Sequence, residues 1–334
     1  CDDNGKSKGE CKSYKSATDA DYELLDDARN EWKQQDEHRD YVPSEQIPEG
    51  AITAASSVSG NDLFQHKYEK WTDMYNDRQL LCLSRLLRAI SDIEDKSSRE
   101  FLLLTFSESL NYNTIMNVYN PNYNKNTNIF KNNSFTPPKE PIENNLWGTA
   151  YGTGTFTSMW DMVHKGAEYA ERYVDDGETI ETEGFSTPIG ENAEVFQGDM
   201  RQMSYENEFD VVITDPPYYD NIIYSEVSDF FYVWQKILLK DEYPGFDQDK
   251  TPRAESIVTN PYLDKTAEDF ESELGQAFSV IKRALKEDGA LTFTYHHSDS
   301  ESWGELLESL CNVGFEVTAT YPITADINKF IQGE

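Results

Sequence analysis

The sequence predicts an α/β fold, in which a mainly helical region precedes an open sheet of parallel or mixed strands. Two observations carry this prediction. From residue 191 onward, short apolar runs typical of strands alternate with longer runs of helical periodicity, which is the pattern of βαβ units. Between residues 61 and 190, apolar residues recur at three- and four-residue steps, as in amphipathic helices.

The length of 334 residues allows one large domain or two ordinary ones. We expect three regions. Residues 1–60 are polar and acidic and read as a linker with a possible zinc-ribbon remnant. Residues 61–190 should be a helical region that includes an asparagine-rich loop. Residues 191–334 carry the strand pattern and should form the C-terminal part of a catalytic domain.

In the first two regions, helices are expected over residues 19–35, over the leucine-rich stretch near residues 80–90, over residues 99–110, and near residues 160–170. Residues 111–146 contain many asparagines and four prolines, which predicts an extended loop. An acidic linker should then lead to about Gly190.

In the last region, we expect strands at residues 193–197, 209–214, 290–295 and 315–321, and helices at residues 225–239, 267–285 and 302–313. The run FDVVIT at 209–214 is almost continuously apolar, which predicts a strand covered on both faces. Phe230 and Trp234 follow helical spacing, so we expect them in a core rather than in a base-stacking platform.

The charge is extreme, with 62 acidic and 29 basic residues and a formal net charge of -33. Nucleic-acid enzymes usually carry a basic surface, so this acidity argues against such a partner unless it has another cause. The acidic residues are spread along the whole chain, which fits a salt-saturated cytoplasm where the Debye length is about 3 Å at 1 M salt. We favour this halophilic interpretation over a protein that avoids nucleic acid.

The chain has four cysteines and no apolar run of about 18 residues, so we expect a cytoplasmic protein without a membrane span. Cys82 and Cys311 lie in helical patterns and should be packed in the core. Cys1 and Cys11 flank a polar stretch that could be the last half of a zinc ribbon. Structural zinc needs four ligands, so no metal site is expected from these two. The chain opens at Cys1 without an initiator methionine, which suggests a longer protein.

The sharpest motif is Asp215-Pro216-Pro217-Tyr218, directly after the apolar strand. Ligands of open α/β sheets bind beyond the carboxyl ends of strands, so this tetrapeptide lies where a site is expected. An aromatic amine is a poor nucleophile because its lone pair is delocalised into the ring. Asp215 and the carbonyl of Pro216 could accept its two hydrogens and aim the nitrogen at a methyl sulfonium, while the prolines stiffen the loop.

The rest of this loop suggests how a base would be held. Tyr218 could stack on a base that has been flipped out of the duplex. Tyr219, Asp220 and Asn221 continue the loop and could line the target pocket. The alternative interpretation of Asp215–Tyr218 is a strand that ends in a rigid Asp-Pro turn.

A second motif, Gly198-Asp199-Met200, follows the strand expected at residues 193–197. It resembles the place where class I methyltransferases hold the adenine of their cofactor. Asp199 would then accept a hydrogen bond from the adenine amino group, with the backbone of Met200 alongside and Gly198 forming the turn. The alternative is an ordinary turn.

The run TDPPYYDNIIYSEVSDFFYVWQK at residues 214–236 resembles the family of adenine-specific DNA methylases that contain a zinc ribbon. Further stretches agree: WTDMYNDRQLLCL (71–83), PPKEPIENNLWG (137–148), GTGTF (152–156) and LTFTYHHSDSESW (291–303). The similarity spans most of residues 40–325. The DPPY motif alone is shared by many amino-methyltransferases, whereas the longer run is more specific to the family.

The resemblance implies a Rossmann-like class I methyltransferase sheet, S-adenosylmethionine as cofactor, and methylation of N6 of adenine in double-stranded DNA with the base flipped out. It also implies an early glycine loop, and no such loop follows an apolar strand here. The stretch GTGTF imitates it without a convincing strand before it. We therefore expect the C-terminal portion of the family, with its N-terminal strand and glycine loop missing.

Several expectations follow from a missing glycine loop. An upstream methylase half, in cis or as a separate chain, becomes an expected partner. The isolated chain should bind S-adenosylmethionine weakly, be inactive, and tend to aggregate through the exposed edge of residues 209–214. Two alternatives stay open: an RNA enzyme that methylates the exocyclic amine of guanine, and a non-catalytic fragment that binds or scaffolds a partner.

Overall fold

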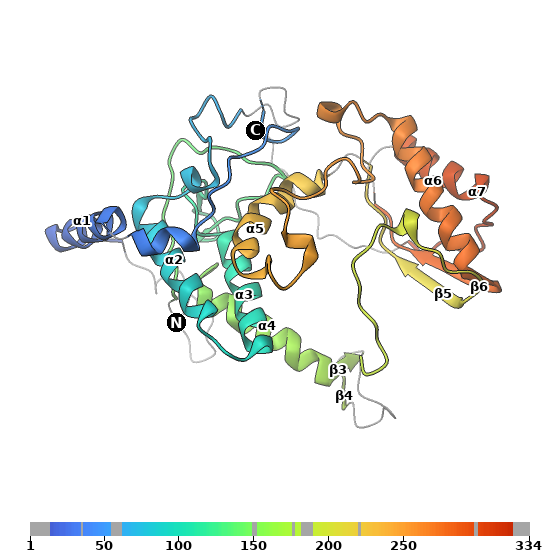
Figure 1. Ribbon diagram of the computed structural model, residues 1–334, viewed down its shortest axis with the longest axis horizontal. Coiled ribbons are helices and arrows are strands. Elements are labelled where there is room, and N and C mark those ends of the chain that lie inside the picture. Colours follow the sequence, from blue (N-terminus) through green and yellow to red (C-terminus); the bar gives the residue numbers. More distant parts are fainter. Residues whose placement is uncertain are drawn as a thin grey trace. The chain divides into compact units, whose positions relative to one another are not determined.

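The computed structural model describes residues 14–34, 36–54, 62–148, 152–175, 178–181, 190–219, 222–296 and 300–322, which form a mixed α/β structure (Figure 1). The chain divides into two compact units. Unit 1 comprises the described residues of Cys1–Phe196, Ile222–Ser256 and Asn260–Asp264. Unit 2 comprises those of Gln197–Asn221, Ile257–Thr259 and Lys265–Glu334.

Unit 1 is mainly helical, as the sequence predicted for its central part. Its α-helices are α1 (Asp19–Gln34), α2 (Asp77–Ser91), α3 (Lys96–Leu110), α4 (Phe156–Glu171) and α5 (Tyr224–Leu239). Its 3-10 helices are η2 (Asp36–Tyr41), η3 (Trp71–Met74), η6 (Pro244–Phe246) and η7 (Pro261–Leu263). Two short antiparallel pairs complete it: β1 (Tyr119–Asn120) with β2 (Lys125–Asn126), and β3 (Arg172–Asp175) with β4 (Glu178–Glu181). The last pair lies where only a linker was expected.

The start of α2 shows how local sequence sets a helix in place. The side chain of Asn76 accepts a hydrogen bond from the backbone of Gln79, and the side chain of Gln79 accepts one from the backbone of Asn76. This reciprocal capping satisfies two backbone donors that the first turn would otherwise leave unpaired. Leu83 and Leu87 follow on the buried face, so the predicted leucine-rich helix is confirmed.

Aromatic side chains dominate the core of unit 1. Phe230 and Trp234 of α5 are both 0% exposed, which confirms their predicted place in a core. Trp234 contacts the rings of Tyr75 and Phe106 at centroid separations of 5.4 and 5.6 Å. Although α5 lies within the 191–334 region of the sequence, it packs with the helices of unit 1.

A buried ion cluster fixes α5 to the segments around it. Arg253 donates to Asp229 at 2.7 Å and to the carbonyl oxygen of Glu49 at 2.8 Å. The Glu226 carboxylate lies 3.7 Å from Arg253 and accepts from two consecutive backbone amides after Gly50. A β-carbon on Gly50 would come within 2.5 Å of both Arg253 and Glu226, so a side chain at this position would displace these two charged groups.

Unit 2 is built on two parallel strands, β5 (Phe209–Thr214) and β6 (Leu285–Phe293). Its helices are η5 (Met200–Gln202), α6 (Ala267–Ala284) and α7 (Ser300–Asn312). Apolar side chains of α6 and α7 form a second core, against which one face of the sheet packs through Val212, Leu291 and Phe293. The helix predicted at residues 267–285 is confirmed as α6. The strand predicted at residues 290–295 is confirmed as β6, although β6 begins earlier, at Leu285.

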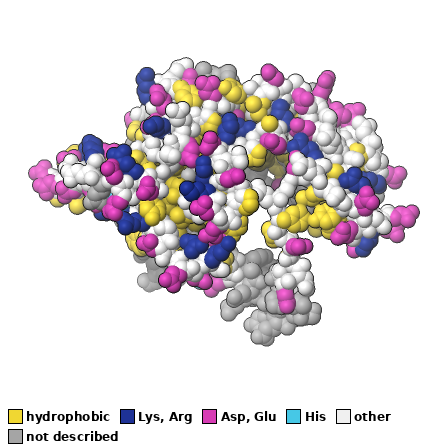
Figure 2. Space-filling view, in the orientation of Figure 1, with side chains coloured by type: hydrophobic (Ala, Val, Ile, Leu, Met, Phe, Trp, Pro, Cys, Tyr) yellow, Lys and Arg dark blue, Asp and Glu magenta, His cyan; other side chains and the backbone are white. Residues whose placement is uncertain are grey.

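The prediction that β5 is covered on both faces is wrong, because apolar side chains on the other face of this sheet are exposed. Phe209, Val211 and Ile213 alternate with the packed residues of β5, and Ile213 is 79% exposed. Figure 2 shows apolar side chains gathered over this strand. The exposure of these three side chains shows that the strand is covered on one face only. Among the described residues β5 pairs only with β6. The alternation of side chains in a strand explains the result, because one covered face buries only every second residue.

Two other predicted strands are wrong. Residues 193–197 and 315–321 are described and are not in strands, and Val195 and Val317 are exposed. A strand needs a neighbour to pair with its backbone groups, and these segments have none among the described residues. The predicted burial of two cysteines is also wrong, since Cys82 and Cys311 are both exposed on their helices. Cys1 and Cys11 lie outside the described residues.

Candidate functional site at the end of a parallel strand pair

Asp215 lies at the carboxyl end of β5, where the sequence predicted a site. The parallel register pairs Thr214 with Phe293, and the backbone amide of Thr294 donates to the carbonyl oxygen of Thr214 at 3.3 Å. Both strands therefore end together, at the edge of the sheet where α/β folds place their ligands. Pro216 is buried directly after Asp215, which anchors the loop while the carboxylate stays exposed.

Two hydroxyl groups fix the carboxylate of Asp215. The phenol of Tyr218 donates to Oδ1 at 2.7 Å, and the hydroxyl of Thr294 donates to the same oxygen at 2.6 Å. Oδ2 accepts no hydrogen bond from the described residues. The carboxylate is therefore held in orientation through one oxygen and keeps its other oxygen open as an acceptor.

An aromatic row continues from this carboxylate. The ring of Tyr218 meets Tyr295 edge-on at 5.4 Å, and Tyr295 meets Trp303 edge-on at 4.9 Å. Trp303 is partly exposed on α7, and Tyr295 is also held by the hydroxyl of Ser302. These rings come from the loop after β5, the end of β6 and the start of α7.

The sequence prediction missed Thr294, Tyr295 and Trp303 as site residues. A signal for Thr294 was present, because the expected strands at 209–214 and 290–295 belonged to one βαβ pattern. Parallel strands bring their carboxyl ends to the same edge, so a hydroxyl just after the second strand could have been placed beside Asp215. The contact of Trp303 depends on helix packing, and no local pattern predicts it.

The remaining loop residues are only partly described. Tyr219 has a positive φ of 53°, and its ring packs edge-on against Phe270 of α6 at 5.2 Å. Its carbonyl oxygen accepts from the backbone of Thr259 at 3.1 Å. Tyr219 thus ties the loop to the core of unit 2, and a role in lining a target pocket stays a prediction. Asp220 and Asn221 lie outside the described residues.

In the second motif, Gly198-Asp199-Met200, the side chain of Asp199 forms an ion pair with Arg201. Asp199 caps η5, and both of its oxygens accept from the guanidinium of Arg201, at 2.7 to 3.1 Å. This contact holds the pKa of Asp199 below its usual range. Met200 packs against the apolar cluster of unit 2. A β-carbon on Gly198 would meet only the end of Met203, at 3.6 Å, so no close approach requires glycine there.

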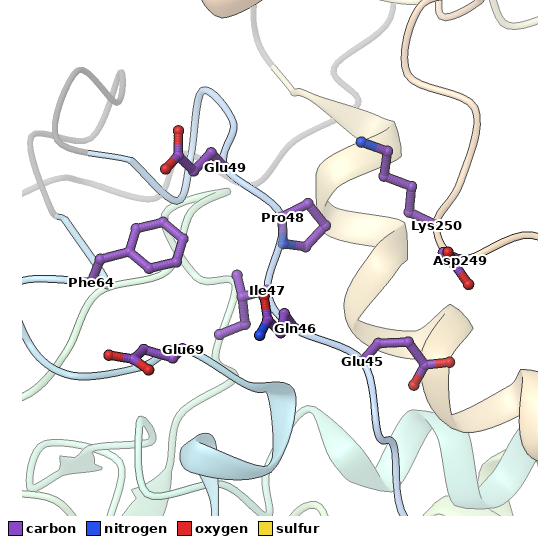
Figure 3. A pocket seen from close by; sticks show the side chains of 9 residues that line it. All are labelled: Glu45, Gln46, Ile47, Pro48, Glu49, Phe64, Glu69, Asp249 and Lys250. Atoms are coloured by element: carbon purple, nitrogen blue, oxygen red, sulfur yellow. The ribbon is translucent and has the colours of Figure 1, made fainter.

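A cavity of about 830 Å³ lies in unit 1 and is unsuited to a phosphate backbone. Figure 3 shows Glu45, Glu49 and Glu69 around it, with Asp249 and Lys250 on one side. The four carboxylates point in different directions, and the described residues hold no cluster of metal-ligating side chains. The excess of negative charge would repel a polyanion.

Comparisons with protein-family models, curated proteins and solved structures find no match to this chain. Among the described residues, no helix is both long and apolar enough to cross a membrane.

Proposed function

We propose that unit 2 carries the amine-binding side of an S-adenosylmethionine-dependent methyltransferase that acts on an exocyclic amino group of a base, N6 of adenine in DNA. One observation carries the proposal. An exposed carboxylate stands at the end of a parallel strand pair, held through one oxygen and open at the other. The expected class I sheet belongs to the same proposal, supported by the parallel pairing of β5 and β6.

The chemistry follows from what an aromatic amine lacks. Its nitrogen lone pair is delocalised into the ring, so the amine needs acceptors that draw its hydrogens out of the ring plane. Oδ2 of Asp215 is available as one acceptor, and the carbonyl oxygen of Pro216 is the second in our proposal. The hydroxyls of Tyr218 and Thr294 keep the carboxylate from rotating, so no reorganisation is needed when charge develops on the nitrogen.

The aromatic row supplies the surface that a flipped base needs. A base outside the duplex has lost its stacking partners, and enzymes that act on flipped bases replace them with aromatic side chains. Tyr218 and Trp303 lie at the two ends of the row, with Tyr295 between them. Stacking on these rings would offset part of the cost of unstacking the base.

The described residues around Asp215 suit the binding of an amine. The described residues do not by themselves form a binding site for S-adenosylmethionine. Asp199 already binds Arg201 through both oxygens, and nothing around Gly198 forms a close cradle. S-adenosylmethionine would supply the methyl group. We propose that an upstream methylase segment, in cis or as a separate chain, completes this side of the site. The exposed apolar face of β5 supports that proposal.

Transfer of a tritiated methyl group tests the proposed function. The protein is purified by affinity tag from the cells that make it, so that any subunit it binds is retained, and is offered DNA and RNA in separate reactions. Digestion to nucleosides then identifies the labelled base. Label in N6-methyladenine from DNA supports the proposal, whereas label in a methylated guanine from RNA would favour the RNA enzyme.

A further inference from the structure

The two faces of the parallel pair β5–β6 differ in what covers them. Val212, Leu291 and Phe293 pack against the core that α6 and α7 form. On the opposite face, Val211 is 54% exposed and Ile213 is 79% exposed. Parallel sheets occur almost only with both faces covered, because the connections between parallel strands place helices there. Among the described residues, the second face of this pair is therefore an unpartnered surface.

The centre of this exposed face is apolar. The parallel register pairs Val211 with Ala290 and Ile213 with Thr292, and all four residues are exposed. Phe209 adds an aromatic ring at the start of β5. Figure 2 shows the apolar side chains together on the surface. Such a face suits packing against another apolar surface better than it suits a polar ligand.

The same alternation of side chains leads to the candidate site. Asp215 and Thr294 occupy the next alternate positions after Ile213 and Thr292, and both are exposed. The hydrogen bond from the hydroxyl of Thr294 to Oδ1 of Asp215, at 2.6 Å, joins the two rows. A partner that covers the apolar face along its length therefore ends beside the proposed catalytic carboxylate.

The amino end of the strand pair is acidic. Exposed carboxylates lie where the two strands begin: Glu206, Glu208, Glu287 and Asp288. Asp210 is also exposed and pairs with Lys286 at 2.8 Å. The cations just before β6, Lys282 and Arg283, lie on α6, which packs on the opposite face. A partner with basic residues complements this end, whereas a second copy of the chain would bring the same carboxylates to it.

The geometry of the strands selects a helix as the covering element. The six residues of β5 rise about 20 Å, at roughly 3.3 Å per residue. A helix of about 13 residues has the same length, at roughly 1.5 Å per residue. Its side chains form one apolar stripe, and its backbone groups bond to one another. An extended segment on this face would leave its backbone groups unpaired against apolar side chains.

We propose that the exposed face of β5 and β6 binds a partner helix of about four turns, whose apolar stripe is flanked by lysine or arginine. The stripe covers Val211 and Ile213, and the basic residues meet the carboxylates at the amino end of the strand pair. This deepens the proposed function, because it names the surface through which the completing segment binds. The identity of that segment rests on the proposed function, whereas the docking requires no methyl transfer.

Site-specific photo-cross-linking identifies what covers this face. The full chain is produced in its own cells with p-benzoylphenylalanine in place of Ile213, and separately in place of Leu307. Leu307 is the matched control, because it is exposed on α7 in the same unit. From the Ile213 position we expect a cross-link to a segment outside residues 1–334, with apolar residues at helical spacing and flanking lysine or arginine. We expect none from Leu307.

Each other cross-linking result would overturn the proposal. A product that joins the Ile213 position to a second copy of this chain would identify a dimer interface. A product with unit 1 would show that the chain covers its own face. A cross-linked segment without the basic helical pattern, the same product from both positions, or no product from the Ile213 position would also contradict the proposed partner.

A synthetic helix tests the chemistry of the surface without methyl donor or DNA. The probe is a peptide of about 13 residues, stapled to hold its helix, with a leucine stripe flanked by lysines. One control peptide carries glutamate in place of each lysine, and another has the leucines scattered around the helix. In titrations with the full chain we expect saturable binding of the probe, weaker binding of the glutamate peptide, and weaker binding of the scattered peptide. The difference between the lysine and glutamate peptides should shrink as KCl rises, because salt screens the charges. Absence of probe binding at millimolar concentration, or equal binding of the scattered peptide, would overturn the proposal.

Variants of Ile213 locate the binding. Ile213→Lys removes an apolar contact and repels the basic flanks, so it should weaken binding of the probe about tenfold or more. Ile213→Glu removes the same contact without the repulsion and should weaken binding less. Leu307→Lys is the control and should leave binding unchanged, with the fold of each variant checked by circular dichroism. Unchanged binding by Ile213→Lys, or equal weakening by Leu307→Lys, would overturn the proposal. Because no methyl transfer is measured, failure of the docking and failure of the proposed function remain distinguishable.

Discussion

The phenol of Tyr218 donates to Oδ1 of Asp215 across 2.7 Å, closing a loop whose two middle residues are prolines. Tyr218, which stacks on the base in our proposal, thus also orients the carboxylate. Thr294, the residue that follows β6, reinforces this contact at 2.6 Å. The carboxylate is therefore held by the segments that follow both strands of the parallel pair.

Tyr218→Phe removes the bond to Asp215 and retains the ring that meets Tyr295. We expect methyl transfer to fall about tenfold, because one preorganising hydrogen bond to a charged group is lost while that of Thr294 remains. Tyr243→Phe is the matched control, since Tyr243 makes the same kind of bond to Glu100 at 2.5 Å in unit 1. Equal loss in both variants would mean that the Tyr218 bond has no special role.

Stability should rise with salt. The formal charge of -33 makes the chain repel itself at low ionic strength, and salt screens that repulsion. We expect the melting temperature to increase as KCl is raised from low to molar concentration, and nucleic-acid binding to survive unusually high salt. Thermal unfolding followed by circular dichroism measures the first effect. A melting temperature that falls over the same range would contradict the halophilic interpretation.

Arg253→Met should strongly destabilise unit 1. The change leaves the buried carboxylates of Glu226 and Asp229 without their cation, and breaking a buried pair from one side typically costs about 3–5 kcal/mol. Arg39→Met is the control, because Arg39 pairs with Asp36 on the surface and such pairs contribute roughly 0–1 kcal/mol. Urea denaturation of both variants gives the comparison. Similar midpoints for the two variants would contradict the importance of the cluster.

A lysine should affect stability differently at Val212 and Ile213, two adjacent residues of β5. Ile213 is 79% exposed, whereas Val212 packs against the core of unit 2. Ile213→Lys should leave stability nearly unchanged and reduce aggregation, since a charge on an exposed strand opposes pairing with another chain. Val212→Lys should destabilise the unit, because its ammonium would enter an apolar core. If light scattering and melting show the same outcome for both, the exposed face is covered in solution.

The sequence predicted the helices well because their apolar spacing and capping residues are local. The helix at residues 267–285 and its end near Ala284 follow from such signals, as does the place of Phe230 and Trp234 in a core. The parallel strand pair also followed from the pattern. What failed was non-local: the exposure of Ile213 and the absence of strands at 193–197 and 315–321 depend on which neighbours each strand has.

The candidate site was predicted in part for the same reason. Asp215 and Tyr218 lie within one short motif, so their placement at a strand end could be foreseen. Thr294 and Trp303 reach the site from β6 and α7, and only pairing and packing bring them there. The pairing of Asp199 with Arg201 is local, and a guanidinium two residues along the chain is the sequence signal for it.

The most direct test of the proposal is Asp215→Ala in the tritiated methyl-transfer assay, with protein purified from its own cells. Loss of a preorganised contact to the reacting group should lower the rate of N6-adenine methylation about 10²–10³-fold. Asp210→Ala is the control, because Asp210 is an exposed carboxylate on the same strand that pairs with Lys286. We predict a large loss for Asp215→Ala, with folding unchanged by circular dichroism, and no loss for Asp210→Ala. Near-normal methylation by Asp215→Ala, or no methylation of any base by the wild-type protein, would contradict the account.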